Sequence, residues 1–277
     1  MKKNLIAALL CVTMVGTMLI GCGKEESSDA SGEKETTSEA SEEEIQGSLK
    51  GVTLRVGTSG LYGPFSYYDE DGSTLIGYDL DLIQDLQDIL GFEIEGGVQA
   101  MDYSALTTSL AEGKLDVGAA ALCATDERKE VMNFTEIYCD AGQVVMINSE
   151  DDKGITGVDD LAGKVVAVEK GTASHTYASK NLTDSTLEVH DTITTAYESL
   201  EQGKVDAVLQ DGPGAAFYIK TTEGTKLKVV GDEFNQGQSP YCVAVAKDCK
   251  YYDQINAALK MLIEDGTTAE LYSKWCE

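Results

Sequence analysis

The segment Leu110-Ala-Glu-Gly-Lys-Leu-Asp-Val117 recurs in altered form as Leu200-Glu-Gln-Gly-Lys-Val-Asp-Ala207. In both copies an amphipathic stretch ends at a glycine, the residue that most easily takes the left-handed conformation at a helix C-terminus. A lysine then leads into an apolar run, 115–122 in the first copy and 205–209 in the second, which is typical of a buried strand. One such copy is ordinary punctuation between a helix and a strand, but two copies favour two related α/β units.

A second pair of matching segments lies upstream of these copies. Leu54-Arg-Val-Gly-Thr58 and Val165-Val-Ala-Val-Glu-Lys-Gly-Thr172 are apolar strands that break at Gly-Thr before a helical pattern. The order of strand, Gly-Thr, helix, Gly-Lys-x-Asp and strand therefore occurs twice. We predict two lobes, and a cleft between two lobes is a common place for a small-molecule site.

The N-terminus has the pattern of a targeting segment. Two lysines precede the apolar run 5–20, which is too short and wrongly flanked for a stable membrane span. The run ends at Leu19-Ile20-Gly21-Cys22, and small or apolar residues directly before a cysteine resemble the bacterial lipobox. We expect a signal peptide at 1–21 and a lipid, with palmitate as one acyl chain, on Cys22. That lipid would anchor the protein to the extracellular face of the membrane. A plain secretory signal is the alternative.

Residues 22–48 are predicted to form an acidic, disordered tether. Between residues 24 and 48 the chain has nine acidic and two basic side chains and almost nothing to bury. The apolar pattern begins at Leu49 and continues to the C-terminus, which is enough chain for two lobes with a core each.

The charge excludes some partners. A formal net charge of −27 argues against binding to nucleic acid, whose affinity comes from basic side chains on phosphates. It also argues against docking on anionic lipid. A single arginine in a cleft can still bind an anion, because distant charges are screened over roughly 10 Å.

The chain has seven cysteines, of which Cys11 lies in the signal peptide and Cys22 is the predicted lipid site. The others are Cys123, Cys139, Cys242, Cys249 and Cys276. No pair has the spacing of zinc ligands, so we predict no metal and no cofactor. A disulfide between Cys249 and Cys276 stays open at this point.

Several further motifs follow one another in a fixed order before the second unit begins at Val165. They are Tyr62-Gly-Pro-Phe65, Gly77-Tyr-Asp-Leu-Asp81, Thr125-Asp-Glu-Arg128 and Phe134-Thr-Glu-Ile-Tyr138. Together with strand-Gly-Thr and Gly-Lys-x-Asp, they resemble the extracellular solute-binding proteins of polar amino-acid ABC importers. The resemblance covers about residues 50 to 276. It implies an α/β fold of the two-lobed, type II periplasmic-binding-protein class, with a ligand cleft between the lobes.

In proteins of that class the chain crosses between the lobes twice. We place the hinge crossings near 139–144 and 234–240. Lobe one is then formed by 49–141 and 237–277, and lobe two by 142–236. The helix after Gly77 is expected to begin at an N-cap, Asp79 or Asp81.

The resemblance also implies a function. It indicates a monomer that captures a free polar amino acid and delivers it to the permease subunits of an ABC transporter. A dehydratase on the same fold and a ligand-sensing domain are the alternatives. We do not expect an enzyme, because the chain has two histidines and no serine or cysteine in a recognised nucleophile motif.

A free amino acid presents a carboxylate and an ammonium, and a specific site must bind both. Arg128 stands beyond a strand end at the family's arginine position, where its guanidinium can grip a carboxylate in a bidentate fork. Asp211, at the matching strand end of lobe two, stands where the family has its amine-binding acid. The structural alternatives are a surface arginine among acidic neighbours and a turn aspartate before Gly212-Pro213.

Further residues are expected to complete the ligand site. Thr172, Ala173 and Ser174 lie at a helix start and can offer N–H and hydroxyl groups to the carboxylate, although Ser174 could equally be a simple N-cap. Tyr62 and Tyr103 are expected to enclose the ligand side chain.

Three positions depart from the family pattern or qualify it. Ala121 and Cys123 replace small or hydroxyl-bearing residues, so Ala121 offers only backbone groups and Cys123 only a weak hydrogen bond. Ser59 stands where relatives that bind basic amino acids carry an aspartate. We therefore expect basic amino acids to be less favoured ligands.

Overall fold

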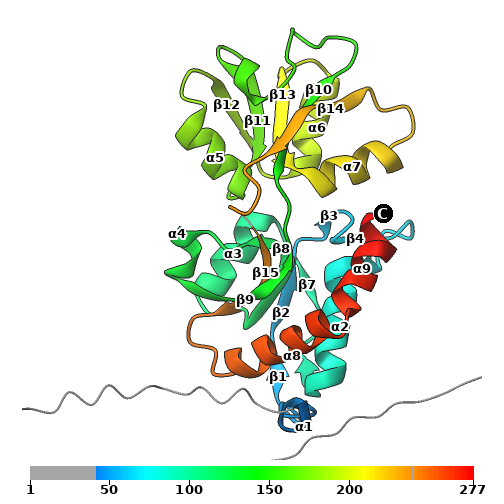
Figure 1. Ribbon diagram of the computed structural model, residues 1–277, viewed down its shortest axis with the longest axis vertical. Helices are drawn as coiled ribbons and strands as arrows, with labels where there is room; N and C mark the ends of the chain where they lie inside the picture. Colours follow the sequence, from blue (N-terminus) through cyan, green and yellow to red (C-terminus); the bar gives the residue numbers. More distant parts are fainter. Residues whose placement is uncertain (1–41, 239) are drawn as a thin grey trace, which may run out of the picture. The chain divides into compact units, whose positions relative to one another are not determined.

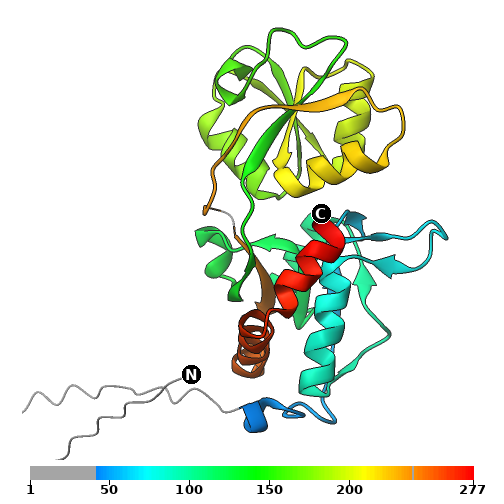
Figure 2. The same ribbon diagram turned by 45° about the vertical axis from the view of Figure 1, so that its right-hand side comes forward.

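The structure is a computed structural model that describes residues 42–238 and 240–277. The predicted signal peptide, the predicted lipid site Cys22 and the tether up to residue 41 lie outside the described residues. Within them the chain forms two five-stranded sheets with helices against both faces, joined by two connecting segments (Figure 1 and Figure 2). This arrangement confirms the predicted two-lobed α/β fold.

The first sheet has the order β7-β2-β8-β15-β9. Its strands are β7 (Gln99–Ala100), β2 (Val56–Thr58), β8 (Val117–Cys123), β15 (Tyr241–Ala246) and β9 (Met132–Cys139). The central strand β8 is parallel to β2 and antiparallel to β15. Its helices are α2 (Tyr78–Leu90), α3 (Tyr103–Ala111), α4 (Asp126–Lys129), α8 (Tyr252–Glu264) and α9 (Thr267–Cys276). Smaller strands complete this lobe: β1 (Thr53–Leu54), β3 (Leu61–Tyr62), β4 (Ser66–Tyr68), β5 (Leu75–Ile76) and β6 (Glu93–Ile94).

The second sheet has the order β12-β11-β13-β10-β14. Its strands are β12 (Thr186–His190), β11 (Val165–Glu169), β13 (Ala207–Asp211), β10 (Gln143–Asn148) and β14 (Leu227–Phe234). Its helices are α5 (Ala173–Asn181), α6 (Ile193–Glu201), α7 (Gly212–Thr221) and a 3₁₀ turn (Val158–Leu161). Alternate residues of β10 belong to separate cores: Val144 packs with α6, and Val145 packs on the other face. Both faces are therefore buried, which explains the continuous apolar runs in the sequence.

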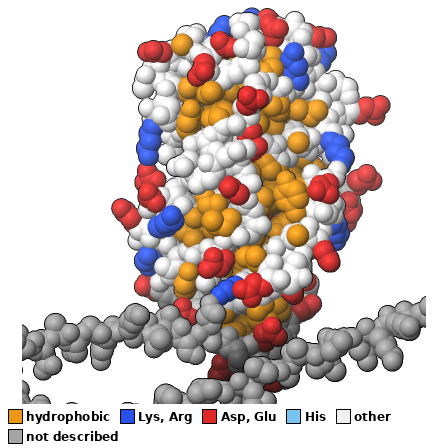
Figure 3. All heavy atoms as spheres, in the orientation of Figure 1, with side chains coloured by type: hydrophobic (Ala, Val, Ile, Leu, Met, Phe, Trp, Pro, Cys, Tyr) orange, Lys and Arg blue, Asp and Glu red, His pale blue; other side chains and the backbone are white. Residues whose placement is uncertain are grey.

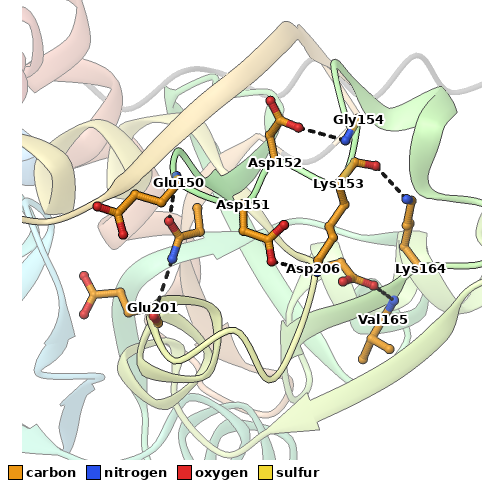
Figure 4. Close-up of polar contacts among 10 residues, drawn as sticks. Glu150, Asp151, Asp152, Lys153, Gly154, Lys164, Val165, Glu201 and Asp206 are labelled. Carbon is orange, nitrogen blue, oxygen red and sulfur yellow. Dashed lines mark hydrogen bonds and ion pairs between the residues drawn. The ribbon is translucent and has the colours of Figure 1, made fainter.

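The repeated Gly-Lys-x-Asp segment has the same structural task in both lobes. Asp116 accepts a hydrogen bond from the backbone N–H of Arg55 at 2.8 Å, directly before β2. Asp206 accepts one from the N–H of Val165, the first residue of β11, also at 2.8 Å (Figure 4). The glycine of each copy has a φ of 67°. The repeat therefore ends a helix at its glycine and fastens the start of a neighbouring strand with its aspartate.

The predicted tether extends too far. Residues Glu42–Ile45 form the short helix α1, and the side chains of Ile45 and Leu49 are buried in the core of the first lobe. The backbone N–H of Gly47 donates to the carbonyl of Ile89 at 2.7 Å. The end of the acidic segment is thus packed against α2, because it contains one apolar residue at the position where the chain meets the lobe.

The predicted N-cap of α2 is also wrong. Gly77 occupies the cap position, and Asp79 is fully buried one residue into the helix. Its two oxygens accept hydrogen bonds from the Ala121 N–H at 2.8 Å and the Tyr138 hydroxyl at 2.6 Å. Asp81 instead accepts from the side chain of Trp275 at 2.7 Å. Both acids bind distant segments, which the local pattern of a helix start does not reveal.

The chain passes between the sheets twice in the described residues. Strand β9 of the first sheet is followed by β10 of the second after residues 140–142, and β14 is followed by β15 after residues 235–240. The disulfide considered between Cys249 and Cys276 is not formed, since both are free thiols. Of the helices in 42–238 and 240–277, none combines the length and the apolar character that crossing a membrane requires.

The surface reflects the acidic composition. In the view of Figure 3, Asp and Glu side chains are spread over the face around patches of hydrophobic side chains, rather than gathered at one place. A ligand site in this molecule therefore depends on its local side chains more than on a surface field.

Candidate functional site

A cavity lies where strand ends and helix starts of the two lobes meet. The first lobe lines it with Tyr62, Tyr103, Ala120, Ala121 and Cys123. The second lobe lines it with Glu169, Thr172, Ala173, Ser174, Ile193, Leu209, Gln210 and Asp211. Most of the residues predicted from the sequence as ligand-binding thus face one cavity.

Asp211 is the last residue of β13 and is held by hydrogen bonds from both lobes. Oδ2 accepts from the hydroxyl of Tyr241 at 2.9 Å, and Oδ1 accepts from the hydroxyl of Ser174 at 3.4 Å. Burial raises the pKa of Asp211 to about 6, while the Tyr241 and Ser174 hydrogen bonds and the charge of Arg128 act in the opposite direction. A cation bound beside it would favour the ionised carboxylate.

Arg128 does not itself line this cavity but binds two residues that do, Tyr103 and Cys123. Thr125 caps α4 by accepting the backbone N–H of Arg128 at 3.4 Å, which fixes where the side chain starts. Nη1 donates to the Tyr103 hydroxyl at 3.1 Å and to the Cys123 carbonyl at 2.7 Å. Nη2 donates to the carbonyl of Gly171 in the second lobe at 2.6 Å. The guanidinium carbon is 5.2 Å from the centre of the Tyr103 ring, so the ring supports it.

Cys123 connects the two charged residues. Its carbonyl is bound to Arg128, and its buried sulfur lies 4.0 Å from Oδ2 of Asp211. Burial, with the nearby Asp211 carboxylate, raises the pKa of the Cys123 thiol well above its ordinary value. The thiol is therefore neutral and lines the floor between the guanidinium and the carboxylate.

The start of helix α5 presents backbone N–H groups at the cavity. Thr172 is the N-cap, and its hydroxyl accepts the N–H of His175 at 3.1 Å. Ala173 and Ser174 form the first turn, where backbone N–H groups have no partner within the helix. Ser174 is not the N-cap considered from the sequence. Its hydroxyl accepts a hydrogen bond from the Gln143 side-chain amide at 3.0 Å and donates one to Asp211. The positive end of α5 makes this wall suitable for an anion.

The aromatic wall comes from the first lobe. Tyr62 stacks on the fully buried Phe65 with ring centres 5.7 Å apart, and its hydroxyl lies 3.3 Å from that of Tyr241. Tyr103 closes another side of the cavity beneath Arg128. Phe65 itself belongs to the core of the first lobe.

Two predicted site residues contribute less than expected. Ser59 is absent from the cavity lining, and its hydroxyl pairs instead with Ser66 at 3.2 Å. Ala121 has a φ of 49°, and its N–H is already bound to Asp79, so only its carbonyl remains available. The unusual backbone at Ala121 is what aims that N–H at a buried carboxyl rather than at the cavity.

Residues 54–277 match the family model of bacterial extracellular solute-binding proteins, family 3. The chain belongs to this family. The arginine-binding extracellular protein ArtP of Bacillus subtilis is 28% identical over 277 residues, which is 99% of this chain and 98% of that protein.

Solved structures of amino-acid-binding proteins are also similar to this chain. An ancestral arginine-binding protein bound to arginine is 35% identical, with a TM-score of 0.75, over 81% of this chain and 98% of that one. The ancestral amino acid-binding protein AncCDT-1, a precursor of cyclohexadienyl dehydratase, is 31% identical, with a TM-score of 0.72, over 81% and 96%.

Sequence reasoning missed five residues that line the cavity of this solute-binding protein, Ala120, Glu169, Ile193, Leu209 and Gln210, and two that hold its lining residues, Tyr241 and Gln143. Glu169 lines the cavity at the end of β11, directly before the Gly-Thr motif. Tyr241 and Gln143 hold Asp211 and Ser174 from the strands that follow the two connecting segments. The position of Glu169 at a strand end was a usable signal, whereas the contacts of Tyr241 and Gln143 have no local pattern.

Proposed function

We propose that this protein captures a free polar amino acid outside the cell and delivers it to an ABC importer. The observation that carries the proposal is that Cys123, which lines the cavity beside Asp211, contacts Asp211 with its sulfur and Arg128 with its carbonyl. The guanidinium offers a carboxylate partner and the carboxylate an ammonium partner, which are the two groups that every free amino acid presents. The relatives named for arginine binding support the same ligand class.

Each lobe would hold one end of the ligand. Arg128 belongs to the first lobe and Asp211 to the second. A ligand shifts a conformational balance only by its differential affinity for the two forms. Amino acids would therefore favour approach of the lobes more than simple amines or simple acids, which engage one side only.

An enzyme is the second candidate, and one observation favours it. Glu169 and Asp211 are two cavity carboxyls with raised pKa values, about 8 and about 6, and such groups can serve as acids or bases. AncCDT-1 is named as a precursor of a dehydratase, but it is itself named an amino acid-binding protein. We favour binding, because Arg128, the N-terminus of α5 and Asp211 together fit the two charged ends of an intact ligand.

The test is mass spectrometry of small molecules released from the purified chain by gentle denaturation, followed by incubation with the molecule found. An unchanged amino acid after incubation supports the receptor. Steady conversion of the added molecule to a product would support the enzyme and contradict the receptor.

The anchor and the place of action belong to the same proposal. We propose that Cys22 carries the lipid, that the protein acts as a monomer at the extracellular face of the membrane, and that no cofactor takes part. Replacement by serine (Cys22→Ser) is expected to leave the folded body intact but to release it from the membrane fraction or leave the signal uncleaved. Wild-type protein without palmitate labelling, together with an unchanged membrane fraction of the variant, would contradict the anchor.

A further inference from the structure

Glu169 places a third carboxyl in the cavity. It is the last residue of β11, and its backbone carbonyl accepts the Thr172 hydroxyl at 2.8 Å, which ties the strand end to the cap of α5. Glu169 lines the cavity together with Asp211. The backbone N–H of Ile193, the first residue of α6, donates to the Glu169 carboxyl.

The surroundings of Glu169 are acidic. Burial is the main cause that raises its pKa to about 8, and the charges of Asp211 and Asp102 act in the same direction. Among the ion pairs that the described residues form, none includes Glu169. Arg128 contacts the lining residues Tyr103 and Cys123, and both of its terminal nitrogens already donate to oxygens of Tyr103, Cys123 and Gly171.

We propose that Glu169 reads the ligand side chain and selects amino acids whose side chain ends in a positive charge, an ammonium or a guanidinium. The inference rests on the proposed function, in which Arg128 and Asp211 take the α-carboxylate and the α-ammonium. With those groups assigned, a ligand with a neutral side chain leaves Glu169 without a counter-charge. A cationic side chain supplies one inside a buried site, where an unpaired carboxylate is costly.

The Glu169 carboxyl also accepts the backbone N–H of Ile193, and this contact uses only part of its hydrogen-bonding capacity. One N–H at the start of α6 occupies one acceptor position, whereas a carboxylate has about four. Thr192 already caps α6 by accepting the N–H of Thr195 at 3.3 Å. Capacity therefore remains for a ligand donor.

This inference reverses the expectation drawn from Ser59. That expectation treated position 59 as the place where an acid would bind a basic side chain. Ser59 lies outside the cavity lining, so the residue at position 59 does not decide whether a basic side chain is bound. Glu169 supplies an acidic group for such a side chain from the second lobe.

The experiment compares matched ligands on matched variants by titration calorimetry. Arginine and citrulline have nearly the same shape and differ in charge, and lysine and norleucine, which lacks the terminal ammonium, form a second pair. Wild type is expected to bind the cationic member of each pair at least about tenfold more tightly. In Glu169→Gln that preference should fall to about threefold or less, mainly through weaker binding of the cationic member. The control is Glu223→Gln, which neutralises an exposed carboxyl and should keep the wild-type preference.

The outcomes separate this inference from the proposed function. Equal affinity of wild type for arginine and citrulline, or a full preference retained in Glu169→Gln, would overturn the role of Glu169 while the receptor function stands. Binding of neutral polar amino acids alone would do the same. If no free amino acid binds wild type, the proposed function itself fails. Glu169→Asp keeps the charge and should retain part of the preference, which decides the matter if the glutamine variant does not fold.

Discussion

The hydroxyl of Tyr241 donates a hydrogen bond to Oδ2 of Asp211 at 2.9 Å. Tyr241 begins β15 in the first sheet, and Asp211 ends β13 in the second, so this bond joins the lobes at the cavity. The same phenol lies 3.3 Å from the hydroxyl of Tyr62. Asp211, the proposed partner of the ligand ammonium, is therefore positioned by Tyr241 of the first lobe as well as by Ser174 of its own lobe.

Replacement of Asp211 by asparagine is expected to weaken binding of the preferred amino acid by a factor of about ten or more, equivalent to about 1.4 kcal/mol per factor of ten. A neutral amide gives up the charge pair with the ammonium. The shift toward closed lobes should shrink as well, because the second lobe loses its contact with the ligand. Calorimetry gives the affinity, and small-angle scattering with and without ligand gives the contraction.

Asp232→Asn is a suitable control for Asp211→Asn, since Asp232 is exposed on β14. Wild-type affinity and full contraction in Asp211→Asn would mean that Asp211 acts only as the residue that leads into α7.

Arg128→Lys is expected to lose binding almost as completely as Arg128→Ala. A lysine cannot form the planar, bidentate pair with a carboxylate, and it cannot reach Tyr103, Cys123 and Gly171 together. The loss should be roughly 2–5 kcal/mol of binding free energy, as for removal of one partner of a buried charge pair. The neighbouring Lys129→Ala is the control, because that side chain is exposed. Calorimetry that finds wild-type affinity in Arg128→Lys would refute the role of Arg128.

Gly214→Ala is expected to hold the lobes apart without harming the fold of the second lobe. Gly214 lies in α7, and a Cβ there would stand 2.3 Å from Cε2 of Tyr62 in the first lobe. The Tyr62 ring is packed on Phe65, so it has little room to withdraw. Within the helix, alanine is itself favoured over glycine by about 0.5–1 kcal/mol.

The measurements for Gly214→Ala are thermal unfolding, ligand affinity and the radius of gyration with ligand. We expect unchanged or higher thermal stability, weaker binding and less contraction. Gly157→Ala serves as the matched control, because a Cβ there meets nothing nearer than 3.8 Å. Full contraction of Gly214→Ala would show that the approach of Tyr62 to α7 is not needed for binding.

The buried carboxyl of Asp79 is expected to make stability depend on pH. Burial raises its pKa from 3.8 to about 7, against the hydrogen bonds from Tyr138 and Ala121. Between these values the folded state holds a proton that the unfolded state has released, so stability falls as pH rises. Asparagine mimics the neutral acid and does not titrate. The stability of Asp79→Asn relative to wild type should therefore improve from pH 5 to pH 8.

Urea unfolding of both proteins at the two pH values measures this difference. Glu169 and Asp211 also have raised pKa values, so some decline with pH should persist in Asp79→Asn. If the free energy of unfolding of wild type instead rises relative to that of Asp79→Asn toward pH 8, the hydrogen bonds from Tyr138 and Ala121 keep the Asp79 carboxylate ionised in the folded state.

The sequence by itself determined the elements and their order. The apolar runs at 115–122 and 205–209 predicted strands that overlap β8 (Val117–Cys123) and β13 (Ala207–Asp211), because both strands are buried nearly throughout. The repeated glycine marked the same helix end in both lobes, since a left-handed residue there is a short-range requirement of the backbone. The bonds of Asp116 and Asp206 to the starts of neighbouring strands are contacts between distant residues and came only from the structure. The ordered motifs also named Arg128 and Asp211.

Only the tertiary structure decided which side chains meet. Asp79 had the local pattern of a helix cap but is buried against β8, and Ser59 had a site position but turns to Ser66. Glu169 lines the cavity from a strand of the second sheet, and Tyr241 binds the lining residue Asp211 from a strand of the first sheet. Such contacts join residues far apart in the chain, and they depend on how packed strand ends are oriented. Local periodicity fixes the face of an element, but packing between the elements decides what that face touches.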